Sequence, residues 1–501
     1  VPKPSLFWAA KNVATFNPDL AAELVWAWQQ QGRPVGWLFN KLHPCTWFLG
    51  DPDAPARAPR LTSQVMDGAG LILRSRYNQA CESYLHLRAA TFATSHFEDD
   101  QLSFHWYAKG APMCLDWGYY GNRETRPVDM HNRTVLGKTK KYRGEVVEKF
   151  FLPRLDYVHI RDTSQNTRVR RLLFVRGDKP TDPEYMILRD TISEAGRWNL
   201  WTFANSVEMK LAGKDKPDEE DKENEEDEED EKDKEFDDEK LLNELAKKSE
   251  VKTDSLTRLR KPTLPNSHGE WVKPFDVPVL DSTVFFTTRF GVDLRVKWLT
   301  PVDRIEMGAY QYHPLSHGEH QKLIRLHKKD AGDFLSVLYP SIHQKEPNAD
   351  IQPWGKGGVK ITRTDGFKHY AWISAPVWRE NSPADLEMNF SFKGTKASGS
   401  AFLIAETPGG RKEICLIGAQ LKFGRIAIRC SKRGAIALAI GPDKIDGVSE
   451  GPERRIDIAL PSKKGKVVVQ AGGKPVQVFI KRGKFTFEVP SGIQKISLQL
   501  R

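Results

Sequence analysis

Hydrophobic positions follow a helical period at the start of the chain. In residues 5–16 apolar side chains recur at spacings of three and four, which predicts a first helix. A second helix follows, because Asn17 is suited to the N-cap and Pro18 to the first helical position. Gly32 ends that run. Both predicted helices are apolar over much of their surface, so we expect them to pack against other helices.

The period changes to two near residue 61. Short runs such as GLILRSR, SYLHLRAATF and RRLLFVRG are rich in β-branched or aromatic residues and are bounded by turn residues. This pattern is typical of antiparallel sheets packed as a sandwich. We therefore predict a mainly β fold, with terminal helices over 1–60, a large antiparallel β-sandwich over 61–384 and a small C-terminal β-domain over 385–501.

A charged tract interrupts the strands at about 211–250. Residues 214–240 contain 18 Asp or Glu and 6 Lys, a local charge of −12. The tract has almost no apolar residues to bury, so we expect a disordered surface insertion. The chain carries +10 in total, so the remaining residues carry +22. A body with this charge attracts polyanions, whether acidic polysaccharide or nucleic acid.

The composition excludes several classes of protein. No apolar stretch approaches the roughly 20 residues of a membrane-spanning helix. No zinc-finger spacing, P-loop or aromatic RNA-binding strand motif is present, so nucleic acid is not the expected partner. The five cysteines are too few and odd in number for a disulfide scaffold, and we expect mainly buried free thiols. They are Cys45, Cys81, Cys114, Cys415 and Cys430.

One segment, residues 96–132, contains several candidate catalytic and metal-binding residues. A tight turn at Lys109-Gly110 joins two short strands, which places Glu98 and Asp116 at neighbouring ends of one hairpin. His131 follows 15 residues after Asp116. Carboxylates and imidazole are competent ligands for zinc and similar divalent ions. By spacing alone the signal is weak, because any Asp, Glu and His within such a window can be surface groups.

The same segment resembles the signature of the heparinase II/III-type polysaccharide lyases, a family related to alginate and ulvan lyases. That signature combines a histidine cluster, a hairpin, an Asp-x-Gly strand end and a His-Asn turn. The resemblance extends over about 60–345. The matching residues are His96-Phe97-Glu98-Asp99-Asp100-Gln101, Ser103 to Pro112 (SFHWYAKGAP), Asp116-Trp117-Gly118 and His131-Asn132.

The resemblance implies a fold and an activity. Members of this lyase family have an α/α toroid before the sandwich, and residues 1–60 look like the last helices of such a toroid. They cleave 4-linked uronate polysaccharides by β-elimination, which leaves unsaturated uronyl ends. The family implies a secreted or periplasmic enzyme, although this sequence begins at Val1 with no signal-peptide pattern. We therefore expect a chain that was processed or cut from a longer one.

The resemblance also implies roles for individual residues. His96 matches a histidine that faces the cleft, where it neutralises the uronate or moves a proton. Tyr120 is a candidate for sugar contact or protonation, with packing as the alternative. Arg123 and Arg126 suit carboxylate or sulfate groups, unless they are simply solvated. Trp117 either stacks on a sugar or belongs to the core.

The implied metal site departs from the family pattern. Glu98 stands where the family has a second histidine ligand, and a carboxylate there favours harder ions. We expect Glu98, Asp116 and His131 to hold one divalent ion, with zinc as the expected metal.

Two other functions compete with the lyase. A non-catalytic polysaccharide-binding module, or a lyase fragment, would bind the polymer without cleaving it. A nucleic-acid-binding protein would bind DNA with a steep dependence on salt. The high positive charge favours a sulfated polymer, such as ulvan or a glycosaminoglycan, over alginate.

Overall fold

The structure is a computed structural model in which two compact units, 1–62 and 63–501, are distinguished. The structure describes residues 5–32, 55–90, 100–117, 128–137, 143–164, 167–209, 264–265, 269–277, 282–312, 319–379, 382–384, 388–441, 444–460, 467–471, 473–481 and 483–500.

The first unit contains the two predicted helices, α1 (Ser5–Val13) and α2 (Pro18–Gln30). The side chain of Asn17 accepts a hydrogen bond from the Leu20 amide at 3.0 Å, as an N-cap residue does. Val25 of α2 is buried in a small apolar cluster with residues of α1. No helix within these ranges is both long and apolar enough to cross a membrane.

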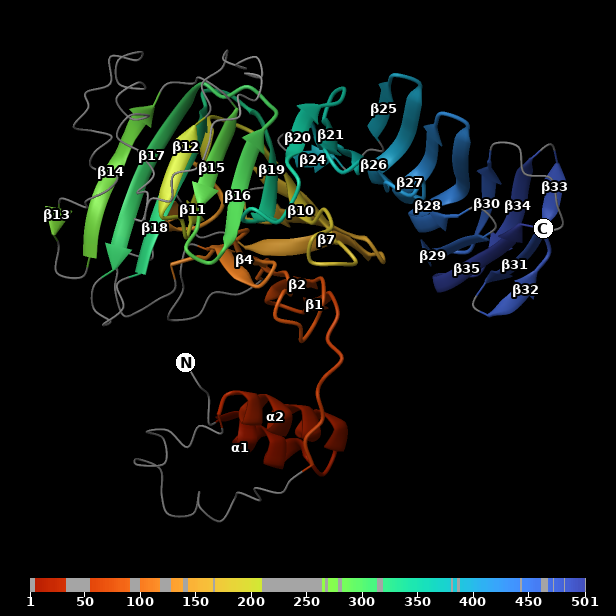
Figure 1. Ribbon diagram of the computed structural model, residues 1–501, viewed down its shortest axis with the longest axis horizontal. Coiled ribbons are helices and arrows are strands. Elements are labelled where there is room, and N and C mark those ends of the chain that lie inside the picture. Colours follow the sequence, from red (N-terminus) through yellow and green to blue (C-terminus); the bar gives the residue numbers. More distant parts are fainter. Residues whose placement is uncertain are drawn as a thin grey trace, which may run out of the picture. The chain divides into compact units, whose positions relative to one another are not determined.

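The second unit is built from antiparallel sheets, which confirms the predicted mainly β fold (Figure 1). A five-stranded sheet has the order β1 (Gln64–Met66), β2 (Gly70–Arg74), β3 (Tyr84–Arg88), β4 (Phe104–Ala108), β5 (Ala111–Cys114). A six-stranded sheet has the order β13 (Leu264–Pro265), β14 (Gly269–Val277), β17 (Arg304–Tyr312), β18 (Glu319–Lys328), β11 (Gly196–Thr202), β6 (Thr134–Leu136).

An eight-stranded sheet forms the centre of the unit. Its order is β12 (Ser206–Met209), β15 (Thr283–Thr287), β16 (Val292–Trp298), β19 (Gly332–Ile342), β10 (Tyr185–Ile192), β9 (Arg168–Val175), β8 (Leu155–Asp162), β7 (Gly144–Phe151). The late strand β19 therefore pairs on one side with β10 and on the other with β16.

Fourteen strands form the last large sheet, which includes the C-terminal region. They are β20 (Ala349–Pro353), β21 (Gly358–Arg363), β22 (Lys368–Ile373), β25 (Met388–Phe392), β26 (Thr395–Glu406), β27 (Lys412–Phe423), β28 (Ile426–Ile440), β29 (Lys444–Gly451), β30 (Arg454–Ala459), β31 (Val467–Ala471), β32 (Lys474–Val476), β33 (Phe479–Lys481), β34 (Lys484–Val489) and β35 (Gly492–Leu500). A short pair, β23 (Val377–Arg379) with β24 (Ser382–Ala384), and a 3₁₀ turn at Val128–Met130 complete the described elements.

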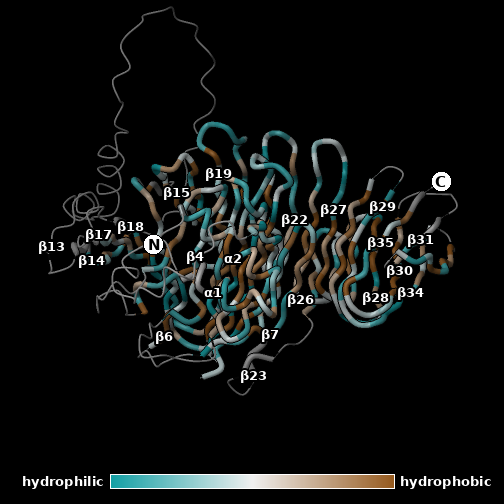
Figure 2. The backbone as a smooth tube through the Cα atoms, turned by 90° about the horizontal axis from the view of Figure 1, so that it is seen from below, coloured by the Kyte–Doolittle hydropathy of each residue, from teal (hydrophilic) through white to brown (hydrophobic). Residues whose placement is uncertain are grey.

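The central sheet is buried on both faces. Side chains such as Leu172 and Leu188 pack into a core shared with the five- and six-stranded sheets. Their neighbours Leu173 and Ile187 point to the opposite face and pack against the fourteen-stranded sheet. Strands β9 and β10 are consequently buried along their whole length. The apolar and polar positions along the strands are coloured in Figure 2.

The change of sheet lies earlier than the expected boundary at 384/385. Strand β22, which precedes that boundary, pairs with β26 from Lys368↔Glu406 to Ile373↔Ala401. Strands β20 to β22 therefore belong to the same sheet as the C-terminal strands, whereas β23 and β24 pair with each other. Backbone pairing between distant strands determines this arrangement, and alternation within each strand does not reveal it.

Candidate functional site

The predicted tight turn at Lys109-Gly110 joins β4 and β5. Both residues have positive φ angles, 52° for Lys109 and 85° for Gly110. A Cβ atom on Gly110 would lie 2.0 Å from the carbonyl oxygen of Ala80, so only glycine fits there. The turn fixes the register of the hairpin, with Ala108 opposite Ala111.

Lys109 anchors this turn to the rest of the unit. Its side chain is fully buried, and Nζ donates to Glu346 at 2.6 Å and to the Pro180 carbonyl at 2.6 Å. Burial lowers the pKa of Lys109, although the charge of Glu346 opposes this effect. Because these contacts occupy the ammonium group, Lys109 has a structural role within the lyase-like motif.

Asp116 and His131 meet at the opposite end of the hairpin. His131 Nδ1 lies 2.5 Å from Asp116 Oδ1, and both side chains are almost completely buried. Ser103 Oγ donates to the other carboxylate oxygen at 2.8 Å. Burial alone would raise the pKa of Asp116, but the charge and hydrogen bond of His131 and the bond from Ser103 lower it. The group is therefore an ionised carboxylate at neutral pH.

Asn132 and Arg170 hold the neighbouring backbone. The Asn132 amide donates to the Phe104 carbonyl at 3.1 Å and accepts from the Trp201 amide at 2.6 Å. Arg170 is paired with Asp190 through two bonds of 2.6 and 2.8 Å. Its remaining nitrogen donates to the carbonyls of residues 102 and 132. The segments on either side of the Asp116–His131 pair are thus fixed by buried hydrogen bonds, of which those of Arg170 are charge-assisted.

Two further histidines, His86 and His105, lie beside this pair. His105 sits opposite His86 in the β3–β4 register, with ring centroids 5.7 Å apart. His105 Nδ1 accepts from the Asp116 amide at 3.3 Å, and its Nε2 lies 3.9 Å from the carboxylate. Burial, with help from His105 and Arg88, lowers the pKa of His86 to about 4. The run SFHWY contains His105, but only the strand register shows that it faces His86.

The structure brings two of the three predicted metal ligands together. An oxygen and a nitrogen separated by 2.5 Å are in hydrogen-bond contact, whereas ligands of one zinc ion lie about 2.0–2.2 Å from the metal. Asp116 and His131 therefore bond to each other in this structure. Glu98 lies outside the described residues, and those residues contain no group of three His, Cys, Asp or Glu that is arranged to hold a metal.

Trp117 is not available for the sugar stacking that the sequence left open as one of two alternatives, because its side chain is 0% exposed. It makes edge contacts with Tyr310 at 4.9 Å and Trp201 at 5.7 Å between ring centroids. Trp117 is therefore a core residue, because its ring is already covered by other aromatic side chains. Among the other predicted site residues, His96, Tyr120, Arg123 and Arg126 lie outside the described ranges.

The cysteines follow the expectation in part. Of the four that the structure describes, all are free thiols, and Cys114, Cys415 and Cys430 are buried. Cys81 is partly exposed.

Comparisons with known proteins give matches among solved structures. No family model and no curated protein matches the sequence. A heparan sulfate lyase, HepC from Pedobacter heparinus, is 15% identical, with a TM-score of 0.40 over 72% of this chain and 46% of that chain. A structure of heparinase III is 13% identical, with a TM-score of 0.40 over 72% of this chain and 47% of that chain.

A third match is a chondroitin AC lyase from Streptomyces coelicolor A3, solved in complex with chondroitin sulphate. It is 9% identical, with a TM-score of 0.42 over 99% of this chain and 59% of that chain. This chain thus spans about half the length of these structures. At TM-scores near 0.4 these likenesses define neither the fold nor the reaction of the chain.

Proposed function

We propose that this chain belongs to a polysaccharide lyase that cleaves an anionic, uronate-containing polysaccharide by β-elimination. The substrate is ulvan or a glycosaminoglycan-like polymer, with alginate as a less favoured choice, and the enzyme is secreted or periplasmic. One observation carries the proposal: Asp116 and His131, which come from two separate parts of the lyase-like motif, are in direct contact in a buried position.

Hydrogen bonds among the described residues join the ends of the segments that carry the motif. Gln101 accepts from the Ala90 amide at 2.8 Å, which ties the two sides of the segment 91–99. Ser103 and Asp116 are joined at 2.8 Å, and Asp116 contacts His131. Segments that carry motif residues therefore start and finish around one buried hydrogen-bonded cluster. This convergence is what a site assembled from several loops requires.

Each motif residue has a proposed part in the elimination. A base removes the proton beside the uronate carboxylate, a positive or hydrogen-bonding group neutralises that carboxylate, and an acid protonates the leaving oxygen. We assign proton transfer or neutralisation to His96 and contact with the leaving sugar to Tyr120. Arg123 and Arg126 are assigned to carboxylate or sulfate binding. General acid–base groups of this kind contribute about 10²–10⁴-fold in rate.

The proposed metal site would reinforce the same cluster. A zinc ion held by Glu98, Asp116 and His131 would join a third segment to the contact between the last two residues. With two carboxylates and one imidazole the site would be nearly neutral, which suits a structural role.

Metal analysis of protein purified without chelator is expected to find about one equivalent of zinc. Glu98→Ala is expected to lose it and to melt at a lower temperature, because metal binding contributes to folding stability. A melting temperature insensitive to both chelator and added zinc would contradict the site.

The test of the reaction is an ultraviolet absorbance assay. The purified chain is incubated separately with heparan sulfate, chondroitin sulfate, ulvan and alginate. Elimination creates a conjugated unsaturated uronate, so absorbance rises with time on the true substrate. Retention on one polymer without any rise in absorbance would reject the lyase for this chain. That result would support the alternative, a non-catalytic polysaccharide-binding module.

A further inference from the structure

One face of the central sheet extends beyond the sheet that covers it. On β19 this face carries Val337 and Tyr339, which are buried against the fourteen-stranded sheet. On the next strand, β16, the register partners of these residues are Lys297 and Arg295. Phe285 of β15 is in turn opposite Arg295. The face therefore changes from apolar to positively charged within one strand.

A groove lies where the fourteen-stranded sheet stops covering this face of the central sheet. Its volume is about 650 Å³, within the range of about 300–1,000 Å³ typical of ligand sites. The central sheet contributes Phe285, Arg295 and Lys297. The first strands of the fourteen-stranded sheet and their loops contribute Asn348, Asp350 and Thr362. The groove thus combines Arg295 and Lys297 with amide, hydroxyl and carboxylate groups. A third cation, Arg363, also lines it but is paired with Asp365 at 2.5 Å.

Arg295 is held in place but is not neutralised. Its guanidinium lies over the Phe285 ring, 4.6 Å from the centroid, and one nitrogen donates to the Ala349 carbonyl. Nε is buried without a hydrogen-bond partner in the described structure. Burial lowers the pKa of Arg295, although Tyr339 and Asp350 oppose this effect. A partly desolvated cation with an unused donor gains energy when an anion binds it.

Among the described residues, neither Arg295 nor Lys297 has a counter-ion. The ion pairs of the described residues include no partner for Arg295 or Lys297, and Asp350 is close enough to influence Arg295 without forming an ion pair. Lys297 is half-buried on the same strand face. Arginine presents a planar fork that matches sulfate or carboxylate, and lysine adds a mobile point charge.

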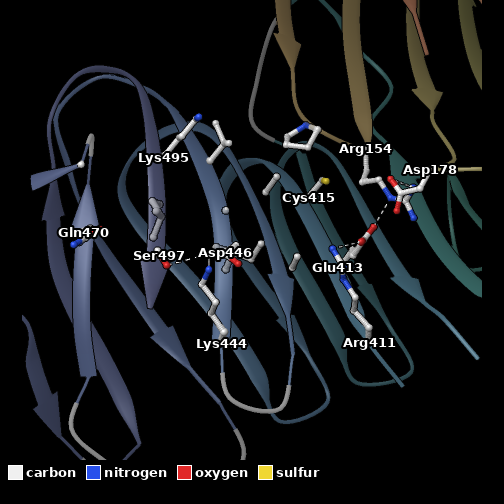
Figure 3. A pocket seen from close by; sticks show the side chains of 18 residues that line it. Arg154, Asp178, Arg411, Glu413, Cys415, Lys444, Asp446, Gln470, Lys495 and Ser497 are labelled. Carbon is white, nitrogen blue, oxygen red and sulfur yellow. Dashed lines mark hydrogen bonds and ion pairs between the residues drawn. The ribbon is translucent and has the colours of Figure 1, made fainter. Parts of the chain in front are cut away.

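A second groove shows what a balanced set of charges looks like (Figure 3). It has a volume of about 560 Å³ and lies along the C-terminal strands. There Arg154 pairs with Glu413 at 2.5 Å, and Lys444 pairs with Asp446 at 3.0 Å. Lys495 also lines this groove. Since most of its charges are neutralised internally, this groove has less need of an anionic ligand and supplies a matched control.

We propose that the groove at Arg295 and Lys297 is an accessory binding site for an acidic oligosaccharide segment. The identity of the ligand rests on the proposed function, because it is the same class of polymer that the lyase would cleave. Arg295 and Lys297 would bind the sulfate or carboxylate groups, while Asn348, Asp350 and Thr362 would exchange hydrogen bonds with sugar hydroxyls. The groove shares no residue with the Asp116–His131 cluster.

A saccharide fits this groove better than DNA. Asp350 repels closely spaced phosphates, but its carboxylate can accept hydrogen bonds from sugar hydroxyls. DNA offers no free ribose hydroxyls for such bonds. Among the residues that line the groove, Phe285 is the one aromatic side chain, and Arg295 already covers one side of its ring.

The test measures binding of a heparan sulfate hexasaccharide by calorimetry. All variants carry His96→Ala, which prevents cleavage of the probe if the lyase proposal holds. Arg295→Gln combined with Lys297→Gln is expected to weaken binding at least about tenfold, because two charge-assisted contacts are lost. Lys495→Gln combined with Lys444→Gln removes the same charge from the other groove and is expected to change binding less than twofold. Arg295→Lys keeps the charge but loses the planar fork, so its effect is expected to lie between these two.

The controls separate this proposal from the lyase. Thermal unfolding of every variant shows whether the fold is kept, and Lys297→Gln alone serves if the double variant unfolds. Equal binding by the Arg295/Lys297 and Lys495/Lys444 variants would overturn the accessory site, even if the wild-type chain shows full lyase activity. Conversely, a selective loss of binding would support the site even if no polymer is cleaved. A DNA duplex that binds as tightly and loses affinity equally would overturn the saccharide assignment.

Discussion

The two ends of the β4–β5 hairpin belong to one sequence motif but have different chemistry. At the turn, Lys109 is closed off from solvent and bonded to Glu346 and to backbone carbonyls. At the other end, Asp116 is bonded to His131 and lies next to His105, whose side chain is 34% exposed. A motif that resembles an enzyme signature can therefore contain residues that only fix the backbone beside residues that are available for chemistry.

Breaking the turn end should have the largest effect on stability. Lys109→Met removes the buried ammonium and leaves Glu346 without this partner, so we expect a loss of about 3–5 kcal/mol in unfolding free energy. Denaturant titration measures this change. Activity per folded molecule is expected to stay close to wild type. A variant with unchanged stability would show that the buried pair does not anchor the hairpin.

Substituting the proposed catalytic histidine should affect turnover instead. If His96 acts as base or neutralising group, His96→Ala is expected to lower the rate at least about 10²-fold, equivalent to about 2.7 kcal/mol in the barrier. Stability should change little. Initial rates on the natural polymer and a melting curve measured side by side provide the check. Unimpaired turnover would remove His96 from the mechanism.

The pH dependence of stability should sharpen the comparison. His86 has a pKa of about 4 in the folded protein, against about 6.5 in the unfolded chain. The unfolded state therefore binds more protons between these values, so stability should fall as the pH drops from about 6.5 to about 4. We expect this group to account for on the order of 3 kcal/mol, since each pKa unit corresponds to about 1.4 kcal/mol. Unfolding titrations with chelator present, compared with His86→Gln, isolate it, since the variant should show a shallower slope.

The smallest effect is expected from a change in the acidic tract. The acidic tract at 214–240 lies outside the described residues, and its composition cannot contribute to a core. Replacing it with a short Gly/Ser linker should leave the melting temperature and the turnover nearly unchanged. A fall of several degrees would show that the tract is packed against the folded protein.

Local rules predicted the local features. The N-cap at Asn17 and the turn at Lys109-Gly110 depend on residues close in sequence, and both are present. The spacing of Asp116 and His131 gave only a weak signal for their contact, because surface positions explain the same spacing, and the resemblance made the contact an expectation. The buried position of Trp117 depends on Trp201 and Tyr310, which lie far along the chain. No pattern within its own segment could reveal them.

Features that depend on pairing between distant strands could not be predicted from the sequence. His86 and His105 lie opposite each other because of the register between β3 and β4. The groove at Arg295 exists because one sheet is wider than its cover, a relation between strands that are distant in sequence. Alternation along β16 correctly predicts that Arg295 faces away from the core that the central sheet shares with the five- and six-stranded sheets. It does not show that the fourteen-stranded sheet covers only part of the face on which Arg295 lies.

The position of β19 in the central sheet has a consequence for how the protein folds during synthesis. This strand lies between β10 and β16, so the middle of the sheet stays open until residue 342 has left the ribosome. Until then, the long apolar edge of β10 has no partner on that side. Pairings between such distant segments form slowly, and unpaired edges promote aggregation. A chain truncated before β19 should therefore accumulate as an aggregate, and chaperones that cover strand edges should raise the yield of the complete protein.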